Sequence, residues 1–377
     1  MIYLKNYKRI GFISNMILLK NADLYTPKHE GIQDIIIDNG KIVYIGKSKE
    51  NENFDEIIDC KGKIVCPEFV DGHEHIIYTE YYDPIDIINS GVGTIVGVLA
   101  NENGQNFVEK NIKTAKRLRK LGIDTYCLAG SKVYRENIEK TILEDKIVIG
   151  VKTALNSQTL IKPNNPTYEE MKELSITTYN LSKKLKRKLQ LHIHLETERG
   201  DLNTSNLSWI DRIVEETDVP YSIFKLTHAQ KYKDKILEYA NKGCYLDFTA
   251  FHEKYDQRYD YLVKAILDTS IDTSKISISS DLGVLNMEKG WRKKESPFTL
   301  LHTIKVLMKE KQLKFEDVLP LITTNPGILI SKNAGKIKQK CRCKILIFDK
   351  EFNIEKVINE RTDNMLNSRV KQKLDLI

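Results

Sequence analysis

The sequence predicts an α/β fold: a (β/α)8 barrel of the TIM type with a small β-sandwich domain formed by both chain termini. Two observations predict the barrel. Short apolar, strand-like runs recur about every 20 to 40 residues, which leaves room for a crossover helix between most neighbours, and the segments between them carry apolar residues at helical spacing. A third observation predicts the sandwich, because alternating apolar and polar residues flank the barrel on both sides.

The barrel elements follow in order along the chain. The strand-like runs end near His75, Ala100, Gly130, Lys152, His194, His228, Ala250 and Asp281. Helical spacing is clear in VEKNIKTAKRLRKLG, in SWIDRIVEE and, after the last strand, in SPFTLLHTIKVLMKE. The Asn325-Pro326 pair is typical of an N-cap followed by a proline in the first turn of a further helix.

The chain termini have a different pattern. Residues 16–66 alternate apolar and polar positions with a turn signal at Asp38-Asn39-Gly40, and residues 335–357 do the same. A chain of 377 residues accommodates one barrel and a satellite domain. We therefore expect residues 67–332 to form the barrel and residues 1–66 and 333–377 to form the sandwich. Because Met16 would serve equally well as a start, residues 1–15 are expected to be an appendage.

Composition excludes several classes of protein. The net charge of +7 comes from lysines spread along the chain rather than from a basic block, so we expect no nucleic-acid partner. No apolar run approaches the ~20 residues of a membrane helix, and the first fifteen residues are a poor signal peptide. Six scattered cysteines are typical of reduced thiols in a cytoplasmic protein. The Cys341-x-Cys343 pair lacks a second ligand pair nearby, which argues against a metal site there.

Histidines gather at the ends of the strand-like runs. They are His73 and His75 in VDGHEH, His192 and His194 in LQLHIHLE, and His228 in FKLTHA. Two histidines at i and i+2 on a strand point to the same side, so each pair could ligate one ion. In a barrel of this type, functional groups gather at the carboxyl ends of the strands. The pattern therefore predicts a metal site at that rim.

Lys152 and Asp281 extend this series. Lys152 ends the apolar run IVIGVK, where an amine is poorly solvated and its neutral form can react with carbon dioxide to give a carbamate. Asp281 closes the run ISISSD. Taken singly, a buried histidine usually packs in a core, an aspartate caps a turn, and a lysine extends to solvent. Several such residues at successive strand ends favour a metal site instead.

The chain resembles the amidohydrolase superfamily and, within it, the isoaspartyl (β-aspartyl) dipeptidases. The resemblance covers about residues 16 to 360 and rests on IVCPEFVDGHEH, SGVGTIVGVLA, GIDTYCLAG, VIGVKTA, LHIHLE, KLTHAQK, CYLDFTA and ISISSD. It implies that His73, His75 and Asp281 bind one metal ion, that His194 and His228 bind a second, and that carbamylated Lys152 bridges the two. His194 matches the family position better than His192, which we expect to be a packed or supporting residue.

The resemblance also implies a reaction. Two divalent ions, with zinc favoured by the nitrogen-rich ligands and manganese or iron as alternatives, would lower the pKa of a bridging water and polarise a scissile carbonyl. Asp281 would accept the proton from the attacking hydroxide and pass it to the departing amine. We expect hydrolysis of an amide bond, first of all in β-aspartyl dipeptides. Alternatives are an N-acyl-amino-acid deacylase, a cyclic-amide hydrolase and a non-catalytic barrel scaffold.

The substrate-binding positions depart from the family pattern. Where the dipeptidases have two arginines that bind substrate, this sequence has Thr159 and Lys231, and lysine lacks the bidentate fork of arginine. For the family's tyrosine, Tyr134 is the nearest candidate, but a direct alignment puts Lys132 there. Glu80 could take over the role of the family's acidic residue. In the sandwich, Cys343-Lys344 replaces the usual Ala-Asp pair. The resemblance further implies a homo-oligomer with a small-molecule or dipeptide substrate.

Overall fold

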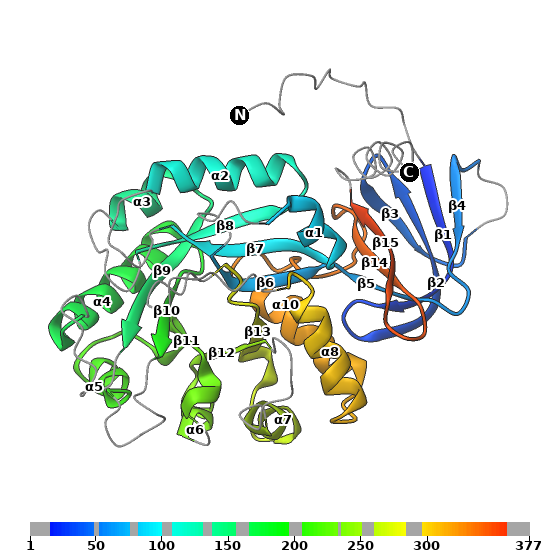
Figure 1. The fold of residues 1–377 in the computed structure, drawn as a ribbon. Helices are drawn as coiled ribbons and strands as arrows, with labels where there is room; N and C mark the ends of the chain where they lie inside the picture. Colours follow the sequence, from blue (N-terminus) through cyan, green and yellow to red (C-terminus); the bar gives the residue numbers. More distant parts are fainter. Residues whose placement is uncertain are drawn as a thin grey trace. The chain divides into compact units, whose positions relative to one another are not determined.

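The fold comprises two compact units (Figure 1). A computed structural model describes residues 16–48, 53–75, 82–99, 108–130, 138–155, 166–195, 206–232, 235–250, 260–283 and 296–359. One unit runs from Pro67 to Lys336, and the other combines the chain up to Cys66 with the chain from Ile337 onward.

The larger unit is a parallel eight-stranded sheet, and this confirms the predicted barrel. Its strands follow one another in chain order, and every pair of neighbours is parallel. The strands are β6 (Phe69–Glu74), β7 (Val92–Val98), β8 (Asp124–Ala129), β9 (Val148–Leu155), β10 (Gln190–Leu195), β11 (Phe224–Thr227), β12 (Tyr245–Thr249) and β13 (Ile276–Ser279).

Helices connect the barrel strands and lie outside the sheet (Figure 1). Between the strands lie α1 (Pro84–Asn89), α2 (Val108–Lys120), α3 (Ile138–Glu144), α4 (Tyr168–Leu185), α5 (Ser208–Glu216), α6 (Lys235–Lys242) and α7 (Asp260–Leu267), and after β13 come α8 (Thr299–Lys309), α9 (Phe315–Val318) and α10 (Thr324–Gly327). The predicted helices are confirmed as α2, α5 and α8. Helix α4 starts at a capping box in which Thr167 and Glu170 bond reciprocally.

The prediction for Asn325 was wrong. Helix α10 starts two residues earlier than predicted, with Thr323 rather than Asn325 at the N-cap position. The Asn325 side chain donates instead to the carbonyl oxygens of Thr273 and Ile276, at 2.8 Å each. These bonds tie α10 to the start of β13, so the asparagine supports tertiary packing rather than its own helix end.

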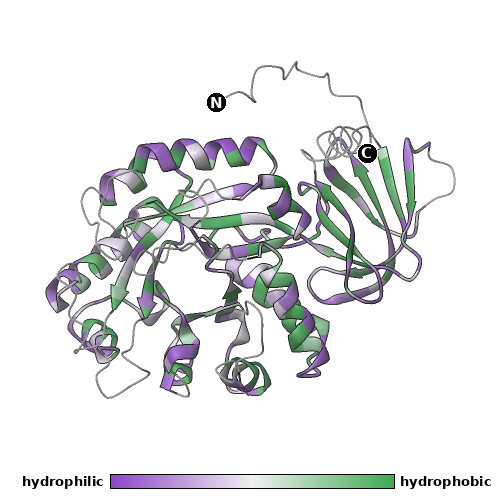
Figure 2. Ribbon diagram, viewed as in Figure 1, coloured by the Kyte–Doolittle hydropathy of each residue, from purple (hydrophilic) through white to green (hydrophobic). Residues whose placement is uncertain are grey.

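Most residues of the barrel strands are buried, as expected for a parallel sheet covered by helices. Figure 2 shows apolar residues concentrated along these strands and polar ones on the outward side of α2. The first and last strands meet at their carboxyl ends: the Asp281 amide donates to the His73 carbonyl at 3.0 Å, and the His75 amide donates to the Leu282 carbonyl at 2.7 Å. The barrel therefore closes through the backbone of candidate site residues.

The smaller unit is a seven-stranded mixed sheet drawn from both ends of the described chain. Its strands are β1 (Met16–Tyr25), β2 (His29–Asp38), β3 (Lys41–Gly46), β4 (Glu56–Asp59), β5 (Ile64–Pro67), β14 (Lys344–Phe348) and β15 (Ile354–Asn359). The predicted turn between β2 and β3 is confirmed: Asn39 and Gly40 have φ angles of 48° and 72°, as a tight hairpin requires. Side chains of β1, β2, β5 and β14 share one apolar core.

All six cysteines are free, and all but Cys341 are buried. Within the described part of the chain, none of the helices combines the length and the apolarity that a bilayer span requires. Residues 1–15 lie outside the described residues.

Candidate metal-binding active site

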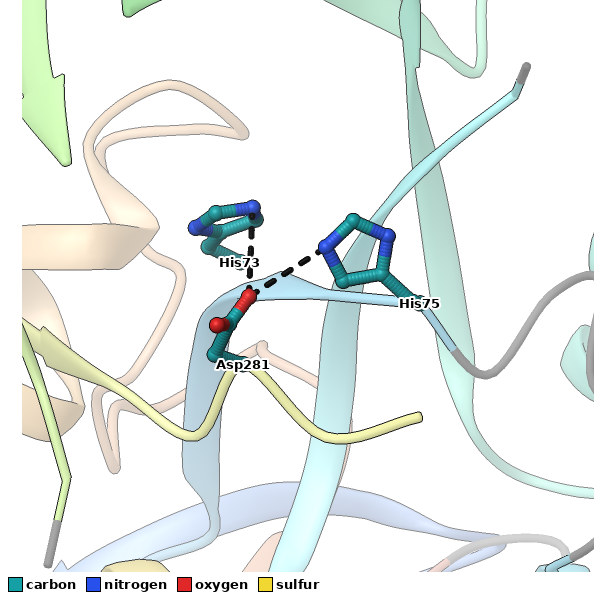
Figure 3. A group of neighbouring side chains, drawn as sticks. All are labelled: His73, His75 and Asp281. Atoms are coloured by element: carbon teal, nitrogen blue, oxygen red, sulfur yellow. Dashed lines mark ion pairs between the residues drawn. The ribbon is translucent and has the colours of Figure 1, made fainter. Parts of the chain in front are cut away.

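His73, His75 and Asp281 form a compact group at the carboxyl rim of the barrel (Figure 3). The Nε2 atoms of His73 and His75 lie 3.7 and 3.2 Å from Oδ1 of Asp281. One ligand atom from each residue falls within 4.8 Å of the others. The backbone bonds that close the barrel bring the three residues together, because they pair the end of β6 with the segment after β13.

Lys152 joins this group from β9. Its Nζ lies 3.0 Å from Nε2 of His73 and donates to Oγ1 of Thr227 at 3.2 Å. The side chain is only 3% exposed. The sequence had suggested that the strand ends near Lys152, but β9 continues to Leu155. The reason is that Thr153, Ala154 and Leu155 keep pairing with β10, so Lys152 points into the barrel from inside a strand.

His194 and His228 complete the cluster from β10 and from the residue after β11. Nδ1 of His194 lies 2.8 Å from Nε2 of His228. The same His228 nitrogen lies 3.9 Å from Oδ2 of Asp281, and the ring centroids of His73 and His228 are 5.6 Å apart. The cluster has two halves, one with His73 and His75 and the other with His194 and His228. Asp281 presents Oδ1 to the first half and Oδ2 to the second. The six residues that the resemblance implies as metal ligands therefore lie close together.

Two residues of the cluster have unusual backbone conformations. His228 and Asp281 have φ angles of 62° and 54°, in the left-handed region that residues with a Cβ rarely adopt. Such positions cost about 1–3 kcal/mol and persist where the surrounding structure enforces them. Here each turns the chain at the end of a barrel strand and directs its side chain to the cluster. Strain of this kind is typical of functional sites.

Burial and neighbouring charges set the protonation of the cluster. Burial, followed by the nearby cationic groups, holds the pKa values of His73 and His228 well below the usual histidine range. Burial alone would raise the pKa of Asp281, but interactions with His228, His75 and Lys152 outweigh it and lower that pKa below the usual range. Neutral imidazoles beside an ionised carboxylate are the forms that bind a metal ion.

Buried polar atoms of the cluster have open bonding capacity. His73 Nδ1 has no hydrogen-bond partner within the described part of the structure, and Asp281 Oδ1 is buried with the His75 imidazole 3.2 Å away. Buried polar atoms without partners are costly, and a bound ion is one accepted way of satisfying them. A set of imidazole and carboxylate ligands suits zinc, manganese or iron. The residues therefore fit the divalent ions that the sequence predicted.

His192 lies on β10 in register with Lys152 of β9 and Lys225 of β11. It is fully buried, and neither ring nitrogen has a hydrogen-bond partner among the described residues. Its neighbour Lys225 forms a buried ion pair with Asp247, with Nζ 3.3 Å from Oδ1. Asp71 accepts a bond from the Ser280 amide at 3.0 Å and one from its hydroxyl. The Lys225–Asp247 pair links β11 to β12, and the Asp71–Ser280 bonds link β6 to the residue after β13.

Among the candidate substrate-binding residues, the structure describes Lys231. It follows His228 in a short 3-10 turn, η4 (Ala229–Tyr232), and its Nζ donates to the Leu195 carbonyl at 3.2 Å. Leu195 is the residue after His194, so the ammonium lies at the rim beside the cluster. Glu80, Tyr134, Lys132 and Thr159 lie outside the described residues.

Two supporting threonines were not found from the sequence. Thr227 contacts Lys152, and Oγ1 of Thr249 lies 2.7 Å from Nδ1 of His228. Both stand at the ends of strand-like runs, in FKLT and DFT. Threonine is common in strands for reasons of packing, so nothing in the sequence distinguishes these two from the others.

Comparison with known sequences gives partial matches. No protein-family model matches the chain. A dihydroorotase from Clostridioides difficile (strain 630) is 31% identical over 115 residues, which cover 26% of this chain and 27% of that protein. A 5'-deoxyadenosine deaminase from Methanobrevibacter smithii is 40% identical over 67 residues, covering 17% and 15% of the two chains. The chain thus matches about a quarter or less of the length of these relatives.

Comparison with solved structures covers nearly the whole chain. A β-aspartyl dipeptidase from Fervidobacterium islandicum AW-1 superposes with a TM-score of 0.76 at 24% identity, covering 92% of this chain and 95% of that one. Its complex with a β-Asp-Leu dipeptide matches equally well. An L-hydantoinase from Arthrobacter aurescens gives a TM-score of 0.66 at 14% identity, with 89% and 86% covered. The resemblance to amidohydrolases is confirmed at the level of the fold.

Proposed function

We propose that this chain, which has the fold of the amidohydrolase superfamily, is a binuclear metal-dependent hydrolase of amide bonds and acts first of all on β-aspartyl dipeptides. The observation that carries the proposal is the convergence of His73, His75, Lys152, His194, His228 and Asp281 at the carboxyl rim of the barrel. That rim is where the active sites of TIM barrels lie.

The metal-binding roles follow the two halves of the cluster. We assign His73, His75 and Asp281 to one ion and His194 and His228 to the other, with a carbamate on Lys152 shared between them. When bound, a pair of divalent ions, zinc in the first place, would activate a water molecule and polarise the scissile carbonyl. The position of Lys152 supports its assignment, because it is buried and lies against the first half of the cluster.

Asp281 is assigned the proton transfer. Its carboxylate lies between the two halves of the cluster, and its lowered pKa keeps it ionised at neutral pH, which is the charge state that a general base requires. It would take the proton of the attacking water and return it to the departing amine. Its backbone amide is bonded to the His73 carbonyl, which fixes where the carboxylate stands.

Several observations bear on the substrate class. The fold of a β-aspartyl dipeptidase and the position of Lys231 beside His194 favour a substrate that carries a carboxylate. The hydantoinase fold and the dihydroorotase match favour a cyclic-amide hydrolase. An N-acyl-amino-acid deacylase is the other alternative, in which Lys231 would bind the one carboxylate of the substrate. Kinetics on β-aspartyl dipeptides, N-acyl amino acids, hydantoins and dihydropyrimidines would separate them. Turnover of a β-aspartyl dipeptide well above the rest is expected.

Lys231→Ala is expected to raise KM for acidic substrates about 10-fold or more. A charge-assisted hydrogen bond is typically worth about 1.5–3 kcal/mol, and the alanine removes it without touching a proposed metal ligand. Michaelis–Menten kinetics on the substrate series provide the measurement. Lys235→Ala, which removes an exposed lysine of α6, is the matched control. Unchanged kinetics of Lys231→Ala on every acidic substrate would remove Lys231 from substrate binding.

Removal of metal should abolish activity and lower the melting temperature. A ligand that binds only the folded state at 100 times its Kd stabilises it by about 2.7 kcal/mol, which corresponds to several degrees in a chain of this size. Dialysis against a chelator and readdition of zinc, manganese or iron, followed by thermal melts and assays, provides the test. Turnover that persists in protein shown by elemental analysis to be metal-free would contradict the proposed function.

Two properties of the whole protein are also proposals. The free and mostly buried cysteines support a cytoplasmic location. A homo-oligomer follows from the resemblance alone, and sedimentation velocity of the purified protein would test it.

A further inference from the structure

On the side of its ring that faces away from His194, the imidazole of His228 contacts Thr249, a residue that the proposed mechanism does not use. Nδ1 of His228 lies 2.7 Å from Oγ1 of Thr249, while Nε2 faces His194 and Asp281. Thr249 is 9% exposed and is the last residue of β12, paired in register with Ser279 of β13. The hydroxyl therefore stands on a strand end that is fixed on its β13 side.

Gln230 fixes the other side of Thr249. Its Oε1 accepts a hydrogen bond from the Thr249 backbone amide at 3.2 Å, and the side chain is buried. Gln230 belongs to η4, the turn that begins immediately after His228. The turn that follows the histidine thus reaches across to the strand that supports the histidine ring. Thr249 therefore contacts the His228 side chain through its hydroxyl and the Gln230 side chain through its backbone amide.

The tautomer of His228 decides what its two nitrogens can do. A neutral imidazole carries one hydrogen, on either Nδ1 or Nε2. A threonine hydroxyl accepts as readily as it donates, so Nδ1–H can donate to Thr249. The lone pair of Nε2 then points toward His194 and Asp281, where a metal ligand is needed. With the hydrogen on Nε2 instead, that nitrogen would donate to His194 Nδ1 and could not bind an ion.

We propose that Thr249 is a positioning residue that holds His228 in the Nδ1-protonated form and so leaves Nε2 free for the metal, with Gln230 keeping Thr249 in place. The role as metal ligand rests on the proposed function, whereas the tautomer is a property of the metal-free protein. Partners of this kind behind a histidine ligand commonly change metal affinity 10- to 100-fold when they are removed.

Thr249→Val tests the proposal, because it keeps the branched shape and removes the acceptor. In metal-free protein labelled with ¹⁵N-histidine, long-range ¹H–¹⁵N spectra distinguish the two tautomers, and His228→Gln identifies the resonance. Wild type and Thr249→Ser are expected to show the Nδ1–H form. Thr249→Val should shift to the Nε2–H form, because an Nδ1–H without an acceptor would be buried and unbonded.

Metal affinity provides the second readout. Competition with a chromophoric chelator should show zinc affinity of one site reduced about 10- to 100-fold in Thr249→Val and restored in Thr249→Ser. Thr178→Val is the matched control, since it removes a buried threonine hydroxyl that bonds within α4. If Thr249→Val does not fold, Thr249→Ala supplies the same comparison.

The outcomes separate this inference from the proposed function. An unchanged tautomer, or a changed tautomer with wild-type zinc affinity, would overturn the role of Thr249. Neither measurement involves a substrate, so both results are independent of which amide the wild-type enzyme hydrolyses. A wild-type protein that hydrolyses none of the amides tested would contradict the proposed function and leave the tautomer result standing.

Discussion

Lys152→Ala is expected to lose most of its bound metal and nearly all of its turnover. The side chain is buried, lies 3.0 Å from His73 and is proposed to carry the carbamate shared by both ions. Alanine removes that shared ligand and leaves the two halves of the cluster to bind separately. Metal-to-protein ratios by elemental analysis and steady-state kinetics measure the two effects together.

Short carboxylates should partly rescue Lys152→Ala, because formate or acetate can occupy the space that the lysine side chain leaves and supply the missing oxygen ligands. Rescue is expected in this variant and in neither wild type nor Asp281→Asn. Lys188→Ala, which removes a partly buried lysine bonded to Tyr245 away from the cluster, is the control for general damage. Full metal occupancy with wild-type turnover in Lys152→Ala would exclude the bridging role.

Asp281→Asn is expected to lower kcat by about 10²- to 10⁴-fold at saturating metal, since an amide cannot accept the proton of the attacking water. The fold should survive. Asparagine tolerates the left-handed backbone that this position has, with φ of 54°. The hydrogen bond from the backbone N–H of residue 281 to the His73 carbonyl is unaffected, because it does not involve the side chain. Assays at increasing metal concentration separate weaker metal binding from slower chemistry.

Asp211→Asn is the matched control for Asp281→Asn. Asp211 also has a lowered pKa; burial opposes the shift, and hydrogen bonds from Lys242, Tyr239 and Tyr221 outweigh it. It lies on α5, outside the cluster. This variant should lose some stability and keep its kcat. If Asp281→Asn retained wild-type kcat with both metal sites filled, another residue would have to be the general base.

The barrel could be predicted because its signals are local. A buried parallel strand is a short apolar run, and a covering helix repeats its apolar residues at helical spacing, so both can be recognised without knowledge of their neighbours. The candidate ligands could be predicted for a related reason. In a parallel barrel the strand ends meet at one rim, so His73, His194 and Asp281 were expected to converge although they are far apart in sequence.

The supporting contacts could not be predicted from the sequence. The partnership of Thr249 with His228 depends on the register between β11 and β12, and a shift of one residue would turn the hydroxyl to the other face of the sheet. The continuation of β9 beyond Lys152 and the bonds of the Asn325 side chain likewise depend on neighbouring elements. Local patterns carry no information about such pairings.

Anomalous diffraction from crystals of the zinc-loaded protein tests the binuclear centre most directly. Two peaks about 3.5–4 Å apart are expected, one beside His73, His75 and Asp281 and the other beside His194 and His228, with density extending from Nζ of Lys152 to both. A single peak or none at saturating zinc, with an unmodified Lys152 amine, would contradict the proposed site.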